Sequence, residues 1–303
     1  MSWRLRALNA GARLTALRRL RRAQKAVELR ATFDRLSWLI SRMPPRTVVL
    51  EDRLGGVPAL WIGPPDPAPN AAILYVHGGA YVAGSPRTHR GMLARLAHGA
   101  GMRVVALDYR LAPEHPFPAA VEDAEAAWDA LVERGYPPSQ IVIGGDSAGG
   151  GLALALLSRL CLRGEIPAGA FAFSPWTDLT LSGLETNPNT ASDPVIPAER
   201  VADAVAAYLK GADPADPRAS PVFADFPDAP PVLIQASDTE LLHDDATRVA
   251  ERIRSQGGFV RLEIYRGVPH VWQMLDRWIP EAREAMGSAA RFVAACCALR
   301  LHR

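Results

Sequence analysis

The residue types best suited to chemistry lie in the stretch Gly145-Asp146-Ser147-Ala148-Gly149, which fits the pattern G-x-S-x-G. An apolar run precedes it at residues 141–143, and a run rich in Leu and Ala follows it at residues 151–162. This order predicts a strand, a tight turn and a helix, with Ser147 at the apex. A strained turn would expose the hydroxyl, and the helix N-terminus would stabilise a developing anion. The alternative is a glycine-rich turn without chemistry, so the rest of the chain must decide.

A serine hydroxyl is a weak nucleophile at neutral pH and needs a base that an acid orients. Where the serine occupies such a turn, the acid and then the histidine follow it along the chain. Three histidines follow Ser147: His243 near a predicted helix start, His270, and the penultimate residue His302. His270 lies in a loop directly after the predicted strand at residues 260–265. Because ligands bind at the carboxyl ends of parallel strands, His270 is the candidate base.

The same reasoning selects the acid. Asp238 follows the predicted strand at residues 232–236 after a single intervening residue, so it is the first choice. Glu240 is the alternative acid. Asp244 and Asp245 lie further on, where they would cap the next helix.

A second glycine-rich turn, His77-Gly78-Gly79-Ala80, follows an apolar strand predicted at residues 71–76. Acyl transfer requires hydrogen-bond donors aimed at the oxyanion. Glycines leave backbone N–H groups unobstructed, so Gly78 and Gly79 could form an oxyanion hole together with the N–H of Ala148. A plain Gly-Gly turn is the alternative, but it would not explain why the turn follows a strand where such a loop belongs.

These turns require an α/β fold to position them. Predicted strands alternate with helices from residue 71 onward, which indicates a mostly parallel sheet with helices on both faces. Strands predicted at residues 47–51 and 59–62 flank a Gly-Gly turn and should pair antiparallel. One domain would span residues 1–303. Two excursions, N-terminal helices at residues 1–45 and an insertion at residues 178–216, would cover the top of the sheet.

The N-terminal segment reads as helix to about residue 43, with leucines at helical spacing and arginines on the other face. Such a basic amphipathic segment could lie on a membrane surface. We expect instead that it packs on the body of the protein. The sequence has no run of 18 apolar residues, so we expect no membrane-spanning helix. The basic N-terminal segment lacks the continuous apolar stretch of a secretory signal, so we expect none.

Composition narrows the function classes further. The chain of 303 residues has a net charge of +2, which gives no argument for nucleic-acid binding. Its three cysteines form no disulfide framework, and no Cys/His cluster has zinc spacing. We therefore expect a cytoplasmic protein with reduced cysteines, no metal and no organic cofactor.

Several motifs in this order resemble the hormone-sensitive-lipase-like esterases of the α/β-hydrolase superfamily, from about residue 74 to the C-terminus. They are His77-Gly78-Gly79-Ala80-Tyr81, residues 108–120 (DYRLAPEHPFPAA), Gly145-Asp146-Ser147-Ala148-Gly149-Gly150, Ser174-Pro175-Trp176-Thr177-Asp178-Leu179, Asp238 and His270. The sequence departs from the family at Ala80, where a third glycine is usual, and at Asp238-Thr239-Glu240, where Asp-Pro-Leu is frequent.

The resemblance implies an eight-stranded α/β-hydrolase fold with a helical cap, a triad of Ser147, Asp238 and His270, and hydrolysis of short- to medium-chain esters. A small-molecule ester would be the substrate, and two copies could pair through an edge strand near residues 260–265. Tyr81 and Trp176 are candidate pocket residues. A lactone hydrolase or an amidase would use the same triad. Plant gibberellin receptors resemble the family but lack the histidine, so the presence of His270 argues against a non-enzymatic receptor.

Overall fold

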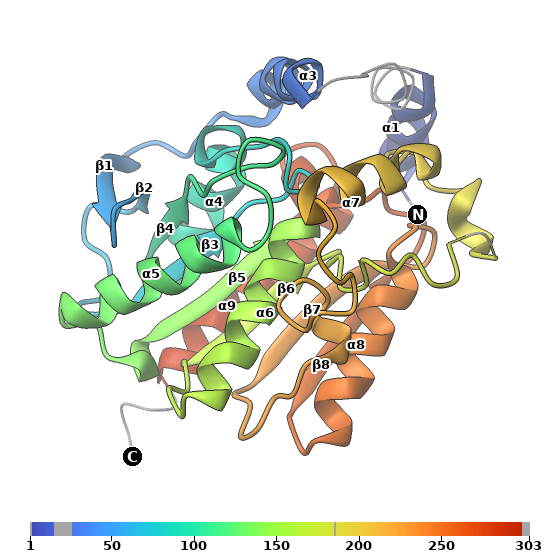
Figure 1. Cartoon of the computed structure of the whole chain (residues 1–303). Coiled ribbons are helices and arrows are strands. Elements are labelled where there is room, and N and C mark those ends of the chain that lie inside the picture. Colours follow the sequence, from blue (N-terminus) through green and yellow to red (C-terminus); the bar gives the residue numbers. More distant parts are fainter. Residues whose placement is uncertain (1, 15–25, 185, 299–303) are drawn as a thin grey trace.

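The computed structural model describes residues 2–14, 26–184 and 186–298 (Figure 1). Within this part of the chain, eight strands form one sheet in the order β1-β2-β4-β3-β5-β6-β7-β8. The strands are β1 (Val48–Leu54), β2 (Val57–Gly63), β3 (Ala72–Val76), β4 (Arg103–Leu107), β5 (Ile141–Asp146), β6 (Gly169–Phe173), β7 (Val232–Ser237) and β8 (Val260–Tyr265). Strand β2 is antiparallel to both neighbours, and all other pairs are parallel. The predicted mostly parallel sheet and its N-terminal hairpin are confirmed.

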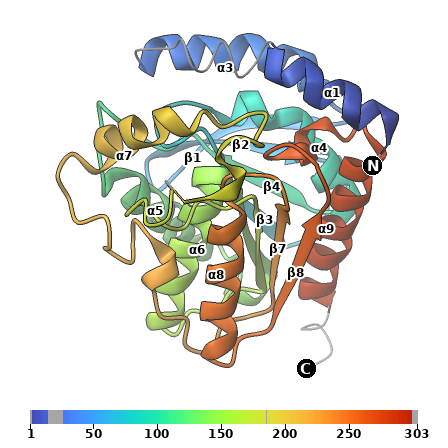
Figure 2. The same cartoon turned by 90° about the vertical axis from the view of Figure 1, so that its right-hand side faces the viewer.

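Helices cover both faces of the sheet (Figure 2). They are α4 (Pro86–Ala100) and α9 (Pro280–Ala298) on one face, and α5 (Ala119–Glu133), α6 (Ser147–Leu162) and α8 (His243–Ser255) on the other. Strand β3 shows why: Leu74 and Val76 pack into one apolar core and Ile73 and Tyr75 into the other. Because successive side chains point to opposite faces, a strand apolar throughout needs helices on both sides.

Two further segments lie above the carboxyl end of the sheet (Figures 1 and 2). The first holds α1 (Trp3–Leu14) and α3 (Ala26–Ile40), and the second joins β6 to β7 and holds α7 (Val201–Leu209). Short 3-10 turns are η1 (Pro138–Gln140), η2 (Pro188–Thr190), η3 (Ala198–Arg200), η4 (Pro221–Phe223) and η5 (Trp272–Leu275). The middle of the predicted N-terminal helix, residues 15–25, lies outside the described residues.

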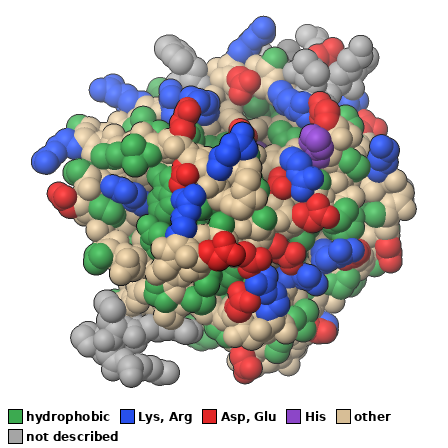
Figure 3. All heavy atoms as spheres, turned by 60° about the vertical axis from the view of Figure 1, so that its left-hand side comes forward, with side chains coloured by type: hydrophobic (Ala, Val, Ile, Leu, Met, Phe, Trp, Pro, Cys, Tyr) green, Lys and Arg blue, Asp and Glu red, His purple; other side chains and the backbone are tan. Residues whose placement is uncertain are grey.

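Helix α1 packs on the body of the protein, as expected. Its Leu5 is fully buried in a small apolar cluster with Val268, Trp272 and Ile279. No described helix has both the length and the apolar character to cross a membrane. The face shown in Figure 3 carries both basic and acidic side chains, interspersed with apolar ones, in keeping with the small net charge.

The three cysteines lie on helices of the two layers that flank the sheet. Cys161 lies on α6, and Cys296 and Cys297 lie on α9; all three side chains are buried. Burial raises the pKa of Cys161 and of Cys297 to about 11, which keeps both thiols protonated and unreactive at neutral pH. Strand β8 forms one edge of the sheet, and its pairing with a second copy stays a prediction.

Candidate active site

Ser147 lies at the sharp turn between β5 and α6, as its sequence pattern predicts. Its φ is 54°, in the left-handed region that a non-glycine residue adopts only under strain. A Cβ at Gly145 would press on the carbonyl oxygen of Gly149, and a Cβ at Gly149 would press on that of Val76. The glycines are therefore required by close packing of the strand, the helix and the neighbouring β3.

A chain of two hydrogen bonds links the serine to a carboxylate. The Nε2 of His270 lies 2.9 Å from the Oγ of Ser147, and its Nδ1 lies 2.7 Å from the Oε2 of Glu240. The side chain of His270 is 8% exposed and that of Glu240 is fully buried. Oε1 of Glu240 accepts a 2.7 Å hydrogen bond from the N–H of Ser237, so the carboxylate is held at both oxygens. This geometry suits a serine nucleophile with an imidazole base.

The surroundings of His270 favour the imidazolium that such a base becomes. Burial disfavours the charged ring. The hydrogen bond with Glu240 and the negative charges of Glu240, Asp193 and Asp146 outweigh burial and raise the pKa of His270.

The acid predicted first, Asp238, does not occupy the position beside His270. Its Oδ1 accepts a 2.7 Å hydrogen bond from the N–H of Gly267, in the loop that carries His270. Strand β7 continues through Ser237, and the turn that follows directs Asp238 toward the neighbouring loop. The chain then folds back, so that Glu240 reaches Nδ1 of His270. Glu240, the alternative in the sequence, therefore replaces Asp238 in the geometry.

One of the three predicted oxyanion donors also needs correction. The N–H of Gly78 donates a 3.0 Å hydrogen bond to the Oδ1 of Asp146, so it is not available to a substrate. Among the described residues, the N–H groups of Gly79 and Ala80 have no hydrogen-bond acceptor. The N–H of Ala148 lies in the first turn of α6, where amides have no partner within the helix. The available set is thus Gly79, Ala80 and Ala148.

Asp146 organises this region from beneath. Its Oδ1 also accepts from the hydroxyl of Tyr75 at 2.6 Å, and its Oδ2 lies 3.3 Å from the Nε2 of His89. Burial opposes the carboxylate, but the charge and hydrogen bond of His89 and the hydrogen bonds of Tyr75 and Gly78 keep the pKa of Asp146 below its usual value. Sequence reasoning did not identify this pair, because Tyr75 and His89 lie outside the recognised motifs.

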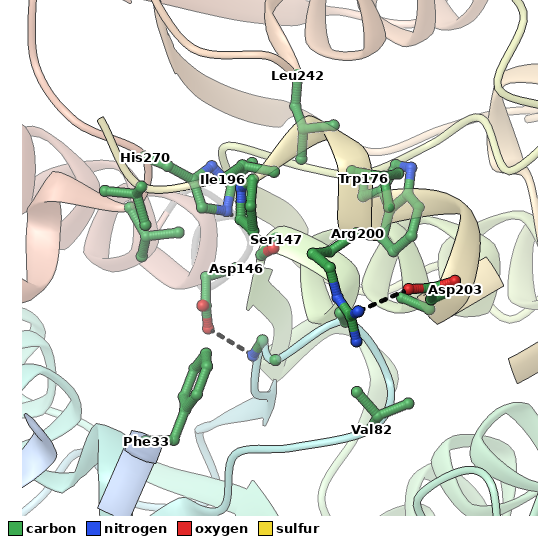
Figure 4. Close-up of a pocket in the computed structure, with 18 of the residues that line it drawn as sticks. Phe33, Val82, Asp146, Ser147, Trp176, Ile196, Arg200, Asp203, Leu242 and His270 are labelled. Carbon is green, nitrogen blue, oxygen red and sulfur yellow. Dashed lines mark hydrogen bonds and ion pairs between the residues drawn. The ribbon is translucent and has the colours of Figure 1, made fainter. Parts of the chain in front are cut away.

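A cavity of about 560 Å³ opens above Ser147 and His270 (Figure 4). Its walls are mostly apolar and come from α3, the segment between β6 and β7, and the loops after β3 and β7; they include Phe33, Val82, Trp176, Ile196, Val201 and Leu242. Arg200 also faces the cavity and pairs with Asp203 at 3.1 Å. The part of the chain that is described contains no cluster of residues able to hold a metal ion.

The two candidate pocket residues differ. Trp176 lines the cavity, as predicted. Tyr81 does not line it, because its ring stacks on that of Tyr208 at 3.8 Å with an interplanar angle of 5°. Sequence reasoning missed Phe33 and Ile196, since apolar residues in helices and loops carry no signal that distinguishes pocket from core.

Comparisons with known proteins agree with this fold. A family profile described as alpha/beta hydrolase fold matches residues 73–274. The chain is 39% identical over 267 residues to an acetyl-hydrolase of Streptomyces hygroscopicus, covering 87% of this chain and 88% of the relative. It is 37% identical to an esterase of Acinetobacter venetianus, with 87% of each chain covered.

A solved structure of an esterase from the bacterial hormone-sensitive lipase family superposes with a TM-score of 0.92, at 39% identity and with 98% of this chain and 99% of that chain covered. The chain therefore belongs to the α/β-hydrolase family, among the hormone-sensitive-lipase-like esterases, and is a carboxylic ester hydrolase.

Proposed function

We propose that this esterase cleaves short- to medium-chain esters through an acyl-enzyme formed on Ser147, with His270 as the base and Glu240 as the orienting acid. The observation that carries the proposal is the continuous hydrogen-bond chain from the Ser147 hydroxyl to Nε2 of His270 and from Nδ1 to Glu240. This is the arrangement that activates a serine hydroxyl at neutral pH.

In the first half of the reaction, Ser147 attacks the ester carbonyl carbon while Nε2 of His270 takes the hydroxyl proton. The N–H groups of Gly79, Ala80 and Ala148 donate to the oxyanion, and Glu240 stabilises the imidazolium. The imidazolium then protonates the leaving alcohol oxygen as the C–O bond breaks. In the second half, His270 takes a proton from water while the water oxygen attacks the acyl carbon. The imidazolium then returns a proton to Oγ of Ser147 as the acyl C–O bond breaks, which releases the acid.

The cavity supports uncharged esters of modest length. Apolar walls bury an acyl chain favourably, and a volume of about 560 Å³ suits a small ligand. The acetyl-hydrolase name of the Streptomyces relative agrees with the short end of this range. We further propose that the N-terminal helices and the segment at residues 178–216 act as a cap, since Phe33 and Ile196 contribute to the same cavity.

The test is Ser147→Ala assayed against p-nitrophenyl esters from acetate to laurate, with lactones and anilides alongside. We expect kcat to fall by about 10⁴-fold or more with the fold retained. In the wild type, acetate to octanoate esters should be preferred. Preference for lactones or anilides would replace the ester assignment with that of a lactone hydrolase or an amidase. Ester turnover that survives Ser147→Ala would refute the mechanism.

A further inference from the structure

A short segment of the insertion between β6 and β7 holds the loop that carries Glu240. Four side chains, those of Asn187, Asn189, Ser192 and Asp193, reach backbone groups of residues 238–241. The contacts are Asn187 Nδ2 to Leu241 O at 2.8 Å, Asn189 Nδ2 to Asp238 O at 3.1 Å and to Glu240 O at 3.0 Å, Ser192 Oγ to Thr239 O at 3.1 Å, and Leu241 N to Asp193 Oδ2 at 2.9 Å. The segment therefore supports every residue of the acid loop.

Asp193 differs from the other three because it is a carboxylate and is only 3% exposed. Its Oδ1 accepts hydrogen bonds from the N–H groups of Val195 at 2.8 Å and Ile196 at 3.0 Å, which line the cavity. Its Oδ2 accepts a hydrogen bond from the N–H of Leu241, the residue after Glu240. One buried side chain thus joins the cavity wall to the acid loop.

A simpler interpretation is a local turn, since Asp side chains often accept from the N–H two residues on. Asp213, in the same insertion, forms such a turn with the N–H of Ala215 at 2.9 Å. Asp213 is exposed, whereas Asp193 is buried and makes a further bond to a distant loop. A turn alone would not require a buried carboxylate, because burying a charge is costly without compensation.

The compensation for Asp193 includes the catalytic base. Burial raises the pKa of Asp193 above its usual value, and the positive charge of His270 and the three backbone N–H groups oppose this rise in part. The negative charges of three carboxylates raise the pKa of His270: those of Glu240 after β7, Asp146 at the end of β5, and Asp193 from the insertion. Asp193 is the member of this set that lies outside the expected motifs.

We propose that Asp193 is a positioning residue of this esterase, which fixes Glu240 against His270 and adds its negative charge to those of Glu240 and Asp146 that stabilise the imidazolium. The inference rests on the proposed function, because it assumes that His270 is the base. Loss of the Asp193 charge should lower kcat more than it raises KM. The turn at Val195 and Ile196 in the cavity wall can form without the charge, so substrate binding should change little.

The experiment compares Asp193→Asn with Asp213→Asn as a matched control that also converts an Asp turn into an Asn turn. In Asp193→Asn the amide oxygen can still accept from Val195 and Ile196, but the NH₂ group would face the N–H of Leu241. We expect kcat on p-nitrophenyl butyrate to fall by about tenfold to a hundredfold, as for loss of a hydrogen bond to a charged group, with KM within about threefold. Asp213→Asn should leave both constants unchanged.

The pH dependence separates electrostatic positioning from a purely structural role. The base must be neutral to accept a proton, so kcat/KM falls as the pH drops through the pKa of His270. Removing a nearby negative charge lowers that pKa, so the acidic limb should move to lower pH by about half a unit or more. Active-site titration with a fluorophosphonate normalises each rate to the fraction of competent enzyme.

The proposal would be overturned if the acidic limb of the kcat/KM profile of Asp193→Asn coincided with that of the wild type. A loss of kcat below threefold would also overturn it. If Asp193→Asn does not fold, Asp193→Ser tests the same point, because a hydroxyl can also close the turn. A wild-type rate in either variant, alongside an inactive Ser147→Ala, would refute only the role of Asp193. Activity in Ser147→Ala would refute the proposed function itself.

Discussion

The assignment of Glu240 rather than Asp238 as the triad acid predicts a large difference between two conservative substitutions. In Glu240→Gln, the amide oxygen can keep the hydrogen bond from the N–H of Ser237, which leaves the NH₂ group facing Nδ1 of His270. An NH₂ group donates, so Nδ1 would have to accept and the ring proton would move to Nε2. His270 would then present a donor to Ser147 instead of an acceptor.

The size of the effect follows from this change of tautomer. In a serine triad, the corresponding Asp to Asn change lowers kcat by about 10⁴, which corresponds to about 5 kcal/mol of transition-state stabilisation. Asp238→Asn is the matched control. Its side-chain oxygen can still accept from the N–H of Gly267, so we expect less than about a threefold change.

The assay measures kcat and KM for p-nitrophenyl butyrate between pH 6 and 9 on each variant, after circular dichroism has shown that the fold is retained. Glu240→Gln should lose kcat at every pH with KM little changed. A loss in Asp238→Asn equal to that in Glu240→Gln, or near wild-type kcat in Glu240→Gln, would refute the assignment.

Two further predictions concern the cavity and a buried carboxyl group. In Ile196→Trp the indole should fill part of the cavity, so kcat/KM for p-nitrophenyl octanoate should fall at least about tenfold relative to acetate; an unchanged ratio would mean that this wall does not contact the acyl chain. Burial raises the pKa of Asp245 to about 7. Between pH 4 and 7 the folded chain therefore binds more protons at this carboxyl group than the unfolded chain does, and the free energy of unfolding falls as the pH rises. Asp245→Asn keeps an acceptor for the N–H groups of Thr177 and Asp178 but cannot ionise, so its Tm relative to wild type should rise from pH 5 to pH 8; parallel Tm curves would contradict this.

Much of the fold, and the proximity of Ser147 to His270, could be predicted because the relevant signals are local. Glycines at Gly145 and Gly149 mark a turn whose backbone leaves no room for a Cβ. Apolar runs such as β3 and β5 indicate strands buried on both faces. The position of His270 after β8 then follows from a general property of parallel sheets, which bring the ends of their strands together.

The acid could not be chosen reliably because the direction of a side chain within a turn depends on tertiary contacts. Asp238 and Glu240 are two residues apart, and either could follow the end of a strand. Two backbone amides determine which carboxylate lies beside His270. The N–H of Ser237 binds the carboxylate of Glu240, and the N–H of Gly267 binds that of Asp238. Tyr81 illustrates the same limit: its motif predicted a pocket residue, but stacking on Tyr208 from the insertion directs the ring away from the cavity.

The proposed oxyanion donors show how one buried residue links the two glycine-rich turns. Asp146 immediately precedes Ser147, and its Oδ1 binds the N–H of Gly78, so the loop after β3 is anchored to the residue beside the nucleophile. Because that anchor uses the first available amide, the free donors are displaced along the loop to Gly79 and Ala80. His89 and Tyr75 also bind the carboxylate of Asp146, so its position is fixed relative to both turns. The proposed nucleophile and the proposed oxyanion donors are therefore positioned together, and this arrangement depends on Tyr75 and His89, which no catalytic motif contains.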